Sequence, residues 1–540
     1  MKKSGRILAG VLAFLLFLIP AACDSTAGGT DSPNSPAAGS SDTPDESAAP
    51  APEGGGEKIT INVGTTDELG SFLYGGAAAT CLIGSYLVYD SMFYMDPETK
   101  ETFSLILDDW YYEDDTTFVM KLKEGITFSN GYKMTGEDLI FSLSNYADRQ
   151  AMVAQMFLAF DFANSYVEDD GLTTVIKTFE PYGPGISAIC VPVMCKKWCE
   201  EVGWESQDWY NNPVGSGPYR VTEYKTDSYV KLERREDYWG DLSQYPVDEF
   251  VIRYYAEDAT EFIDLETGAI DIAAGIAEAD YARAKAGVEG IAVEKISSGD
   301  NMFFCMDIKN QYLSNPRVRE AIACAVDWNA VGVAGYGELY AEPTSILSSS
   351  NPYYVNTGTY KYDPDRARKF LADAGYSEGE ISFKFVCMEQ EQMKTMSEAI
   401  QFYLSEVGIS LSLEYYDFAT TLGKWLSEGG SDFNFQSTTT GAPTGEPFIS
   451  LQSLMVGYGS FAVCTIDDDT FNRIAYEGLK SIDSKVRAAA YAELQKYAYN
   501  NFLVIPLVEN ALAVAYRTDV VADINFWHGK DCNLRYITLA

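Results

Sequence analysis

Ile400-Gln-Phe-Tyr-Leu-Ser-Glu-Val-Gly-Ile-Ser-Leu-Ser-Leu413 is the stretch of sequence that decides the fold class. Up to Val407 its apolar residues recur at the spacing of one helix face, and from Ile409 to Leu413 apolar and polar residues alternate as in a strand. Gly408 lies between the two patterns, where glycine commonly ends a helix. Helix, glycine and strand in direct succession are typical of an α/β layer, so we expect a mixed α/β fold.

The same two patterns recur along the chain before this stretch. Strands are predicted at residues 59–64, 118–123, 219–221 and 229–232, and the last two flank a turn and predict a hairpin. Capping residues predict helix starts at Thr135, Asn315 and Asp363. The body after residue 57 has about 480 residues, and with 37 Tyr, 28 Phe and 8 Trp in the chain it is large enough for two or three domains.

The N-terminus has the pattern of an export signal. Basic residues precede an apolar run of about 13 residues, at 7–19, and the small residues Ala21 and Ala22 follow it. The run is well short of the ~20 residues that a membrane-spanning helix needs. We therefore predict a signal peptide over residues 1–22 and a mature protein that crosses no membrane.

Cys23 follows the small residues, and this arrangement resembles the lipobox of bacterial lipoproteins, whose cysteine is diacylated and becomes the first residue. Pro20 departs from the usual leucine, so ordinary secretion stays open as an alternative. The chain that follows consists almost wholly of Gly, Ala, Ser, Thr, Pro, Asp and Glu up to Glu57, a composition that cannot fold. Residues 23–57 are thus predicted to be a lipidated cysteine and a disordered acidic linker.

Charge and composition exclude several classes of function. A net charge of -40 argues against nucleic acid as a partner. The chain has one histidine, His528, and no H-E-x-x-H, G-x-S-x-G or Walker A pattern. These observations favour binding over catalysis, although an exported hydrolase that uses two carboxylates stays open.

The cysteines do not predict a metal site. Ten cysteines less Cys23 leave nine, an odd number without regular spacing. Cys195 and Cys199 have helical spacing, but the two-residue spacing typical of zinc ligands is absent. We expect buried or free thiols, no metal and no cofactor.

Five segments, in order along the chain, together resemble the family 5 extracellular solute-binding proteins, which are the peptide, nickel and oligosaccharide binders of ABC importers. They are Phe118-Val-Met-Lys-Leu-Lys-Glu-Gly-Ile-Thr-Phe-Ser-Asn-Gly131 with Thr135-Gly-Glu-Asp-Leu-Ile-Phe141, Asn212-Pro-Val-Gly-Ser-Gly-Pro-Tyr219 with Arg234-Arg-Glu-Asp-Tyr-Trp-Gly240, Gly268-Ala-Ile-Asp-Ile272, Pro316-Arg-Val-Arg-Glu-Ala-Ile322 with Ala325-Val-Asp327, and residues 363–375.

The resemblance implies a two-lobed periplasmic-binding-protein-like fold with two hinge strands and an extra subdomain inserted in the first lobe. Carried onto this chain, lobe I is residues 58–84, 205–295 and 503–540, the inserted subdomain is 85–204, and lobe II is 296–502. The lobes are expected to close over the ligand, because a ligand that contacts both lobes favours the closed state.

The function implied is that of a monomeric, lipid-anchored protein outside the cytoplasm, on the periplasmic side or outer face of the cell membrane. It would capture a peptide and deliver it to the permease and ATPase subunits of an ABC importer. An oligosaccharide stays open as the ligand, whereas nickel is disfavoured because family members that take the metal rely on histidine.

The resemblance also implies ligand-binding residues. Peptide binders of the family hold the α-amino group with an aspartate in a W-x-x-D-Y-x-D-P-like stretch, which here reads Phe435-Gln-Ser-Thr-Thr-Thr-Gly-Ala-Pro-Thr-Gly-Glu-Pro447 and lacks the tryptophan and the first aspartate. Glu446 is then the candidate for the negative charge, and two further segments, 65–74 and 301–307, face the cleft in such folds. The candidate residues are Ser71, Phe72, Tyr74, Asn301, Phe435, Thr438, Thr439, Thr440, Gly441 and Glu446.

Overall fold

A computed structural model describes residues 58–540 of the chain, with gaps at 68, 73–82, 97–98, 100, 150–153, 186–188, 204–205, 207–211, 426, 428, 438–445, 448–450, 452–453, 455–465 and 525–533. The described residues belong to one compact unit. The predicted signal peptide, Cys23 and the acidic linker lie outside the described residues.

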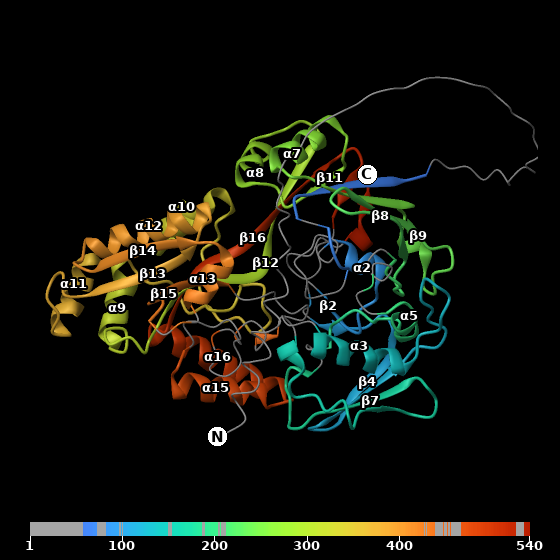
Figure 1. Ribbon diagram of the computed structural model, residues 1–540, viewed down its shortest axis with the longest axis horizontal. Coiled ribbons are helices and arrows are strands. Elements are labelled where there is room, and N and C mark those ends of the chain that lie inside the picture. The colour runs from blue at the N-terminus through green and yellow to red at the C-terminus, as the bar shows by residue number, and fades with distance from the viewer. Residues whose placement is uncertain are drawn as a thin grey trace, which may run out of the picture. The chain divides into compact units, whose positions relative to one another are not determined.

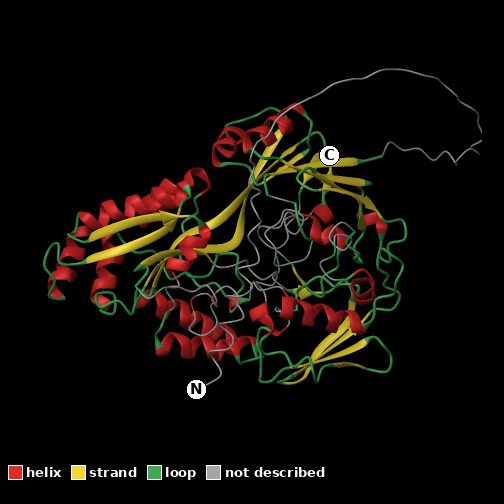
Figure 2. Ribbon diagram, in the orientation of Figure 1, coloured by secondary structure: helices red, strands yellow, loops and turns green. Residues whose placement is uncertain are grey.

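A ten-stranded sheet organises the described part of the chain (Figures 1 and 2). From one edge to the other its strands are β14 (Ser410–Tyr416), β13 (Ser382–Met388), β15 (Phe433–Ser437), β12 (Ile291–Met306), β16 (Val504–Arg517), β11 (Ile272–Ala274), β1 (Thr60–Thr65), β10 (Glu249–Tyr254), β9 (Tyr229–Arg234) and β8 (Tyr219–Lys225). The sheet is mixed, with parallel pairs, such as β13 with β14, and antiparallel ones, such as β12 with β16. The mixed α/β fold and the predicted hairpin, β8 and β9, are confirmed.

The stretch that predicted the fold class forms the expected elements. Helix α12 spans Glu391–Ser405, and strand β14 begins at Ser410. Gly408 between them has a φ of +78°, a left-handed conformation that glycine adopts without the steric cost paid by other residues. The neighbouring helices that pack with this half of the sheet are α9 (Pro316–Ala325), α10 (Trp328–Tyr336), α11 (Pro364–Asp373) and α13 (Phe418–Trp425).

The predicted helix starts are also confirmed. The Asn315 side chain accepts a hydrogen bond from the Arg317 N–H, and the Asp363 side chain accepts one from the Arg366 N–H. Helix α3 (Gly136–Arg149) begins directly after Thr135, whose N–H donates to the Asp138 carboxylate at 2.8 Å. A side-chain acceptor at each of these starts satisfies a backbone donor that has no partner inside the helix.

A separate four-stranded sheet lies within residues 85–204, the range predicted as the inserted subdomain. It comprises β4 (Leu107–Asp114), β5 (Thr117–Leu122), β7 (Thr173–Lys177) and β6 (Tyr166–Val167), and α3 packs on it. The described residues of this range also form α2 (Ser85–Val88), α5 (Lys196–Val202), and β2 (Tyr94–Met95) with β3 (Thr102–Phe103).

Helices α15 (Asp469–Leu479) and α16 (Ser484–Asn500) contact the range predicted as the inserted subdomain. The Gly183 N–H donates to the Leu479 carbonyl at 2.7 Å, and the Lys480 ammonium lies 2.7 Å from the Glu180 carboxylate. Apolar residues of both helices also share a hydrophobic cluster with residues of that range. Residues predicted to belong to different lobes therefore touch here, and the predicted boundaries of the lobes stay predictions.

Two further helices share a small apolar cluster with Ala513 and Ala515 of β16. They are α7 (Asp258–Thr267), which contacts β11 and β1, and α8 (Glu278–Lys285), which contacts β12 and β16. Near the C-terminus, β17 (Val521–Asp523) pairs with β18 (Thr538–Leu539).

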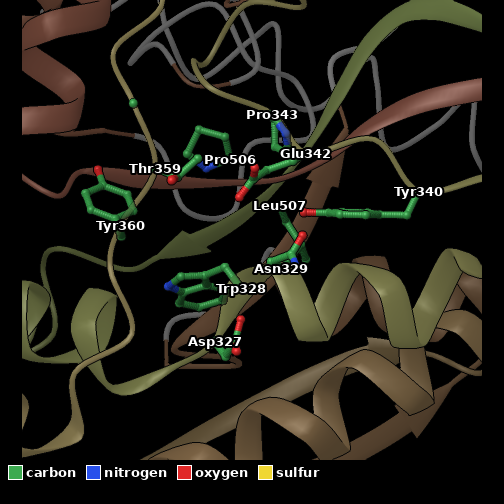
Figure 3. A pocket seen from close by; sticks show the side chains of 11 residues that line it. Asp327, Trp328, Asn329, Tyr340, Glu342, Pro343, Thr359, Tyr360, Pro506 and Leu507 are labelled. Atoms are coloured by element: carbon green, nitrogen blue, oxygen red, sulfur yellow. The ribbon is translucent and has the colours of Figure 1, made fainter.

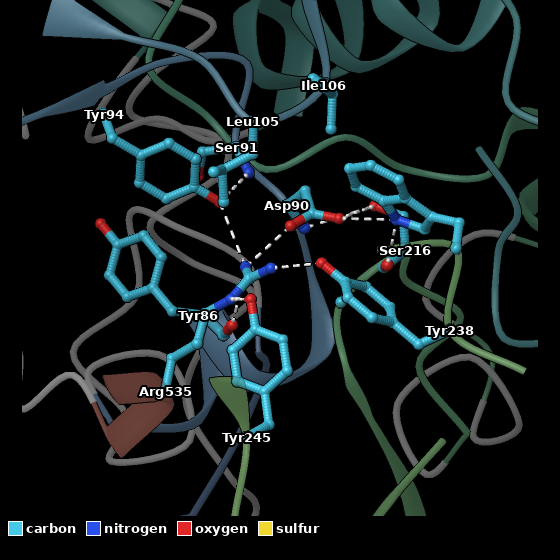
Figure 4. Close-up of polar contacts among 12 residues, drawn as sticks. Tyr86, Asp90, Ser91, Tyr94, Leu105, Ile106, Ser216, Tyr238, Tyr245 and Arg535 are labelled. Atoms are coloured by element: carbon cyan, nitrogen blue, oxygen red, sulfur yellow. Dashed lines mark hydrogen bonds and ion pairs between the residues drawn. The ribbon is translucent and has the colours of Figure 1, made fainter. Parts of the chain in front are cut away.

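A fully buried ion pair fastens the C-terminal segment to the rest of the molecule (Figure 4). The Arg535 guanidinium lies 2.7 Å from the Asp90 carboxylate, and both side chains are 0 % exposed. Ser216 and the Trp239 indole N–H donate to the same carboxylate at 2.9 and 3.2 Å, while Arg535 donates to the Tyr238 hydroxyl at 2.7 Å. Because solvent does not reach this network, we interpret it as structural.

Candidate ligand-binding site at the hinge strands

Strands β12 and β16 connect the two halves of the large sheet. They pair with each other from Ile291 opposite Arg517 to Cys305 opposite Val504. Strand β11 pairs with β16 near one end of this ladder, whereas β15 pairs with β12 near the other end. Figure 1 shows the two strands running side by side between these neighbours. One predicted lobe boundary, at residues 295–296, falls within β12 and the other, at 502–503, directly precedes β16, so we take these two strands as the hinge.

The ladder between β12 and β16 is interrupted at its middle. Ser297 lies opposite Ala511, and the next pair is Asn301 with Glu509, so three residues of β12 face one residue of β16. Gly299, within this bulge, has a φ of +77°. Bulges bend a strand and redirect its side chains, and they are common beside functional sites.

Glu509 lies at this interruption with its side chain almost wholly buried, at 6 % exposure. One carboxylate oxygen, Oε1, accepts hydrogen bonds from the hydroxyls of Ser297, Ser348 and Ser349 at 3.0, 2.8 and 2.7 Å. The Ser349 N–H donates to the same oxygen at 3.2 Å. No cation among the described residues forms an ion pair with Glu509, and its second oxygen, Oε2, accepts no hydrogen bond from them.

Asn301, a candidate from the sequence, lies opposite Glu509 and is 1 % exposed. Its amide nitrogen donates to the Ser345 carbonyl at 3.0 Å. The Ser345 hydroxyl donates in turn to the Gln495 side chain of α16 at 2.9 Å. The hinge is thus joined by hydrogen bonds to the segment around residue 345 and to helix α16.

Glu446, the one charged candidate from the sequence, forms an ion pair. Its side chain is 1 % exposed and contacts the Arg487 guanidinium of α16. The Tyr491 hydroxyl donates to its other carboxylate oxygen at 3.0 Å. Burial and the negative charge of Glu446 raise the pKa of that hydroxyl well above its usual value, so it remains a donor. The charge of Glu446 is therefore compensated within the chain.

The aromatic candidates are part of the core. Phe72 is 2 % exposed and packs against Gly84, where an added Cβ would lie 2.7 Å from its ring. Phe435 is 5 % exposed and its ring centroid lies 4.9 Å from that of Phe385. Ser71 is partly buried. The candidates that fall outside the described residues are Tyr74, Thr438, Thr439, Thr440 and Gly441, and the ligand-binding role of every candidate stays a prediction.

A small cavity lies beside β16, between two acidic and several aromatic side chains (Figure 3). Its volume is about 50 Å³, whereas ligand pockets commonly have about 300–1,000 Å³, so it is far smaller than a peptide site. Asp327, one of its carboxylates, caps helix α10 by accepting from the Ala330 N–H at 3.0 Å. The residues that line the cavity are Asp327, Trp328, Asn329, Tyr340, Glu342, Pro343, Gly358, Thr359, Tyr360, Pro506 and Leu507.

The described residues contain no group of three or more His, Cys, Asp or Glu side chains arranged to hold a metal ion. Burial raises the pKa of the Cys195 thiol to about 12 and also that of the Cys387 thiol to about 12. Thiols that remain protonated at neutral pH are poor metal ligands.

Sequence reasoning passed over Glu509, although the sequence carries a signal for it. In Val504-Ile-Pro-Leu-Val-Glu-Asn-Ala-Leu-Ala-Val-Ala-Tyr516, Glu509 is the one ionisable side chain before the final tyrosine in an otherwise largely apolar strand. Such a residue is rarely buried without a partner. Which side chains surround it depends on segments that are far apart in the sequence.

Comparison with known proteins assigns the class. The sequence profile described as "Bacterial extracellular solute-binding proteins, family 5 Middle" matches residues 103–459, which is more than half of the chain. The chain therefore belongs to the family 5 bacterial extracellular solute-binding proteins, and the family expected from the sequence is confirmed. By this family description it is an extracellular solute-binding protein.

Among its relatives is the glutathione-binding protein GsiB of Shigella dysenteriae, 23 % identical over 466 residues, which cover 83 % of this chain and 88 % of the relative. The periplasmic binding protein DppA of Helicobacter pylori, solved with the peptide STSA, superimposes with a TM-score of 0.72 at 17 % identity over 89 % of this chain and 98 % of that one. The dipeptide-binding protein of Pseudoalteromonas sp. SM9913, solved with Met-Leu, superimposes with a TM-score of 0.70 at 19 % identity. The match covers 89 % of this chain and 100 % of that one.

These structural likenesses confirm the expected two-lobed periplasmic-binding-protein fold. In the part of the chain that the structure describes, no helix has both the length and the apolar character required to traverse a bilayer.

Proposed function

We propose that this protein captures a peptide between its two lobes and delivers it to the permease and ATPase subunits of an ABC importer. The single observation that carries the proposal is the interrupted ladder between β12 and β16. It places polar and charged groups, Asn301 and Glu509 among them, where the two halves of the large sheet meet. A ligand bound beside a hinge contacts both lobes and so favours closure. The relatives named above, which bind glutathione or were solved with peptides, support a peptide as the ligand.

The proposal includes the location and the chemistry of the protein. Cleavage before Cys23 would leave a diacylated cysteine, and two acyl chains anchor a protein stably in a membrane. The acidic linker, residues 24–57, would let a monomeric body move at the outer surface, with a reach of about 30 Å. The bound peptide would leave unaltered, because the protein acts as a carrier and not as an enzyme.

A thermal-shift screen of the body, residues 58–540, tests this function. Di- to pentapeptides, glutathione and oligosaccharides are compared at equal concentrations. A ligand at 100 times its Kd stabilises the folded state by about 2.7 kcal/mol, so a peptide ligand is expected to raise the Tm measurably. Mass spectrometry of the recovered ligand should show it intact. Stabilisation by oligosaccharides alone, or turnover of the ligand, contradicts the proposal.

A further inference from the structure

Three carboxylates with little or no exposure differ in what compensates their charge. Asp90 lies against the Arg535 guanidinium and Glu446 against the Arg487 guanidinium. Glu509, at 6 % exposure, has only neutral donors around it among the described residues. Removing an ionised carboxylate from water is costly unless a cation or a full set of hydrogen bonds replaces the water. Of these three, Glu509 is the carboxylate for which the described part of the chain supplies no cation.

The donors around Glu509 are distributed unevenly over its two oxygens. All four hydrogen bonds converge on Oε1, from three serine hydroxyls and one backbone N–H. Such donors hold the carboxylate in one orientation, whereas Oε2 is left for a partner from outside the described chain. A carboxylate has about four acceptor sites, two on each oxygen, so Oε2 retains its full capacity.

The position of Glu509 connects this capacity with ligand binding. It lies on β16 opposite Asn301, at the interruption of the hinge ladder. The side chains that orient it come from β12 and from the segment at residues 348–349, which is more than 150 residues away in the sequence. A carboxylate fixed from two sides at a hinge is preorganised, and a preorganised group binds its partner without an ordering cost.

We propose that the Glu509 carboxylate binds the ammonium group of the ligand, with Oε2 accepting a charge-assisted hydrogen bond from the ammonium nitrogen. For a peptide that group is the N-terminal amine, so this inference rests on the proposed function and names the ligand chemistry of the same site. Glu446, the acid next to the expected motif, is held by Arg487 and Tyr491, which leaves the ammonium to Glu509.

The expected effect follows from the strength of such a bond. A hydrogen bond between two charged groups out of water contributes more than a neutral one, and an ammonium replaced by a neutral amide would leave Glu509 buried without a cation. N-acetylation of the peptide is therefore expected to weaken binding on the order of 10- to 100-fold.

A double-mutant cycle between ligand and protein tests the inference by isothermal titration calorimetry. The peptide that stabilises the wild type most and its N-acetylated form are titrated into the wild type and into Glu509→Gln. Acetylation is expected to weaken binding to the wild type by the factor above and to change binding to Glu509→Gln by less than about threefold. Equal acetylation effects in the two proteins would overturn the inference, because Glu509 would then act on the structure alone.

Glu294→Gln is the matched control. Glu294 lies on β12 opposite Val514 of β16, outside the interruption between Ser297 and Asn301. Its carboxylate accepts a hydrogen bond from the Tyr516 hydroxyl at 2.7 Å. Its variant should keep the full acetylation effect. If Glu509→Gln does not fold, Glu509→Asp and Ser349→Ala replace it. Glu509→Asp shortens the side chain that carries the carboxylate and should reduce the effect of acetylation on binding. Ser349→Ala keeps the charge of Glu509 and should preserve that effect. A full acetylation effect in Glu509→Asp together with a reduced one in Ser349→Ala would overturn the inference.

The outcomes separate this inference from the proposed function. If peptides bind but acetylation has the same effect in both proteins, the inference fails and the function stands. If no peptide stabilises the wild type, the function fails, and the screen is repeated with primary amines that contain no peptide bond, such as agmatine and spermidine. Stabilisation by an amine that is lost in Glu509→Gln supports the inference with another ligand, and no response to any amine overturns it.

Discussion

Glu446 on the α16 side and Glu509 at the hinge are both acids removed from water, but their surroundings are opposite. Glu446 has a guanidinium and a phenol as partners. Glu509 has hydroxyls and one N–H, and no cation among the described residues. The comparison teaches that an acid at the position of a ligand-binding motif, as Glu446 is, can be used in a structural ion pair. An acid outside any motif, as Glu509 is, can be the one available to a ligand.

The largest effect is expected from breaking the Glu446 pair. Arg487→Met would leave Glu446 buried without its cation, and removing one partner of a buried pair costs about 3–5 kcal/mol. Urea denaturation of wild type and variant measures the difference in the free energy of unfolding. The control is Arg473→Met, whose pair with Glu477 is half exposed on both sides and is expected to contribute at most about 1 kcal/mol. A loss below 1 kcal/mol for Arg487→Met would contradict this account of Glu446.

Glu261 sharpens the comparison as a third kind of buried acid. It is 0 % exposed on α7, and neither carboxyl oxygen has a hydrogen-bond partner of normal geometry among the described residues. Burial, reinforced by the charge of Asp258, raises its pKa to about 8, and the nearby Ala274 N–H opposes this only in part. Without a cation or several donors to stabilise its charge, this acid is kept neutral at pH 7.

The pH dependence of stability follows from that shift. The folded state holds the Glu261 proton more tightly than the unfolded chain, so its contribution is fully present below about pH 4 and is lost as the pH rises to about 8. Glu261→Gln lacks this dependence, so between pH 4 and pH 8 the free energy of unfolding of the variant should rise relative to that of the wild type by on the order of 4 kcal/mol. Urea denaturation at both pH values measures it, and a difference that does not change with pH would show that Glu261 ionises freely.

A smaller effect on stability is expected from Glu509→Gln. No cation loses its partner, and the serine donors keep an oxygen to bind, so the free energy of unfolding without ligand should change by less than about 1 kcal/mol. Thermal denaturation without and with a peptide ligand separates the two roles, because the ligand should stabilise the variant less than the wild type. A ligand-free loss as large as that of Arg487→Met would make Glu509 a structural residue like Glu446.

The smallest effect is expected where the ion pair is exposed. Lys480, directly after α15, forms an ion pair with Glu180 of the range predicted as the inserted subdomain, and both side chains are 49 % exposed. Lys480→Met should lower the free energy of unfolding by less than about 1 kcal/mol, since solvent screens such pairs. Denaturation in low and high salt checks this, because a screened pair leaves little difference between wild type and variant at high salt. A loss that persists at high salt would point to packing rather than charge.

Much of the fold could be predicted because its determinants are local. The caps at Asn315 and Asp363 and the glycine at 408 act within a few residues of themselves, and each produced the expected helix start or end. The contact between Gly183 and Leu479 could not be predicted in this way, because it joins segments nearly 300 residues apart. Periodicity shows which face of an element is buried but not what covers it.

The candidate site was less predictable for the same reason. A loop position such as Phe72 is apolar whether it lines a cleft or fills a core, and the structure places it in the core. Glu509 is recognisable only together with Ser297 and Ser348, which are 212 and 161 residues away. The charge balance of a buried acid depends on such distant partners, and no short motif contains them.

A crystal structure of the protein with the peptide that stabilises it most tests the central claim most directly. The account predicts the N-terminal ammonium nitrogen at roughly 2.7–2.9 Å from Glu509 Oε2, the usual length of a charge-assisted hydrogen bond, with the Glu446–Arg487 pair intact. An ammonium bound to another carboxylate, or a ligand that makes no contact with Glu509, would contradict it.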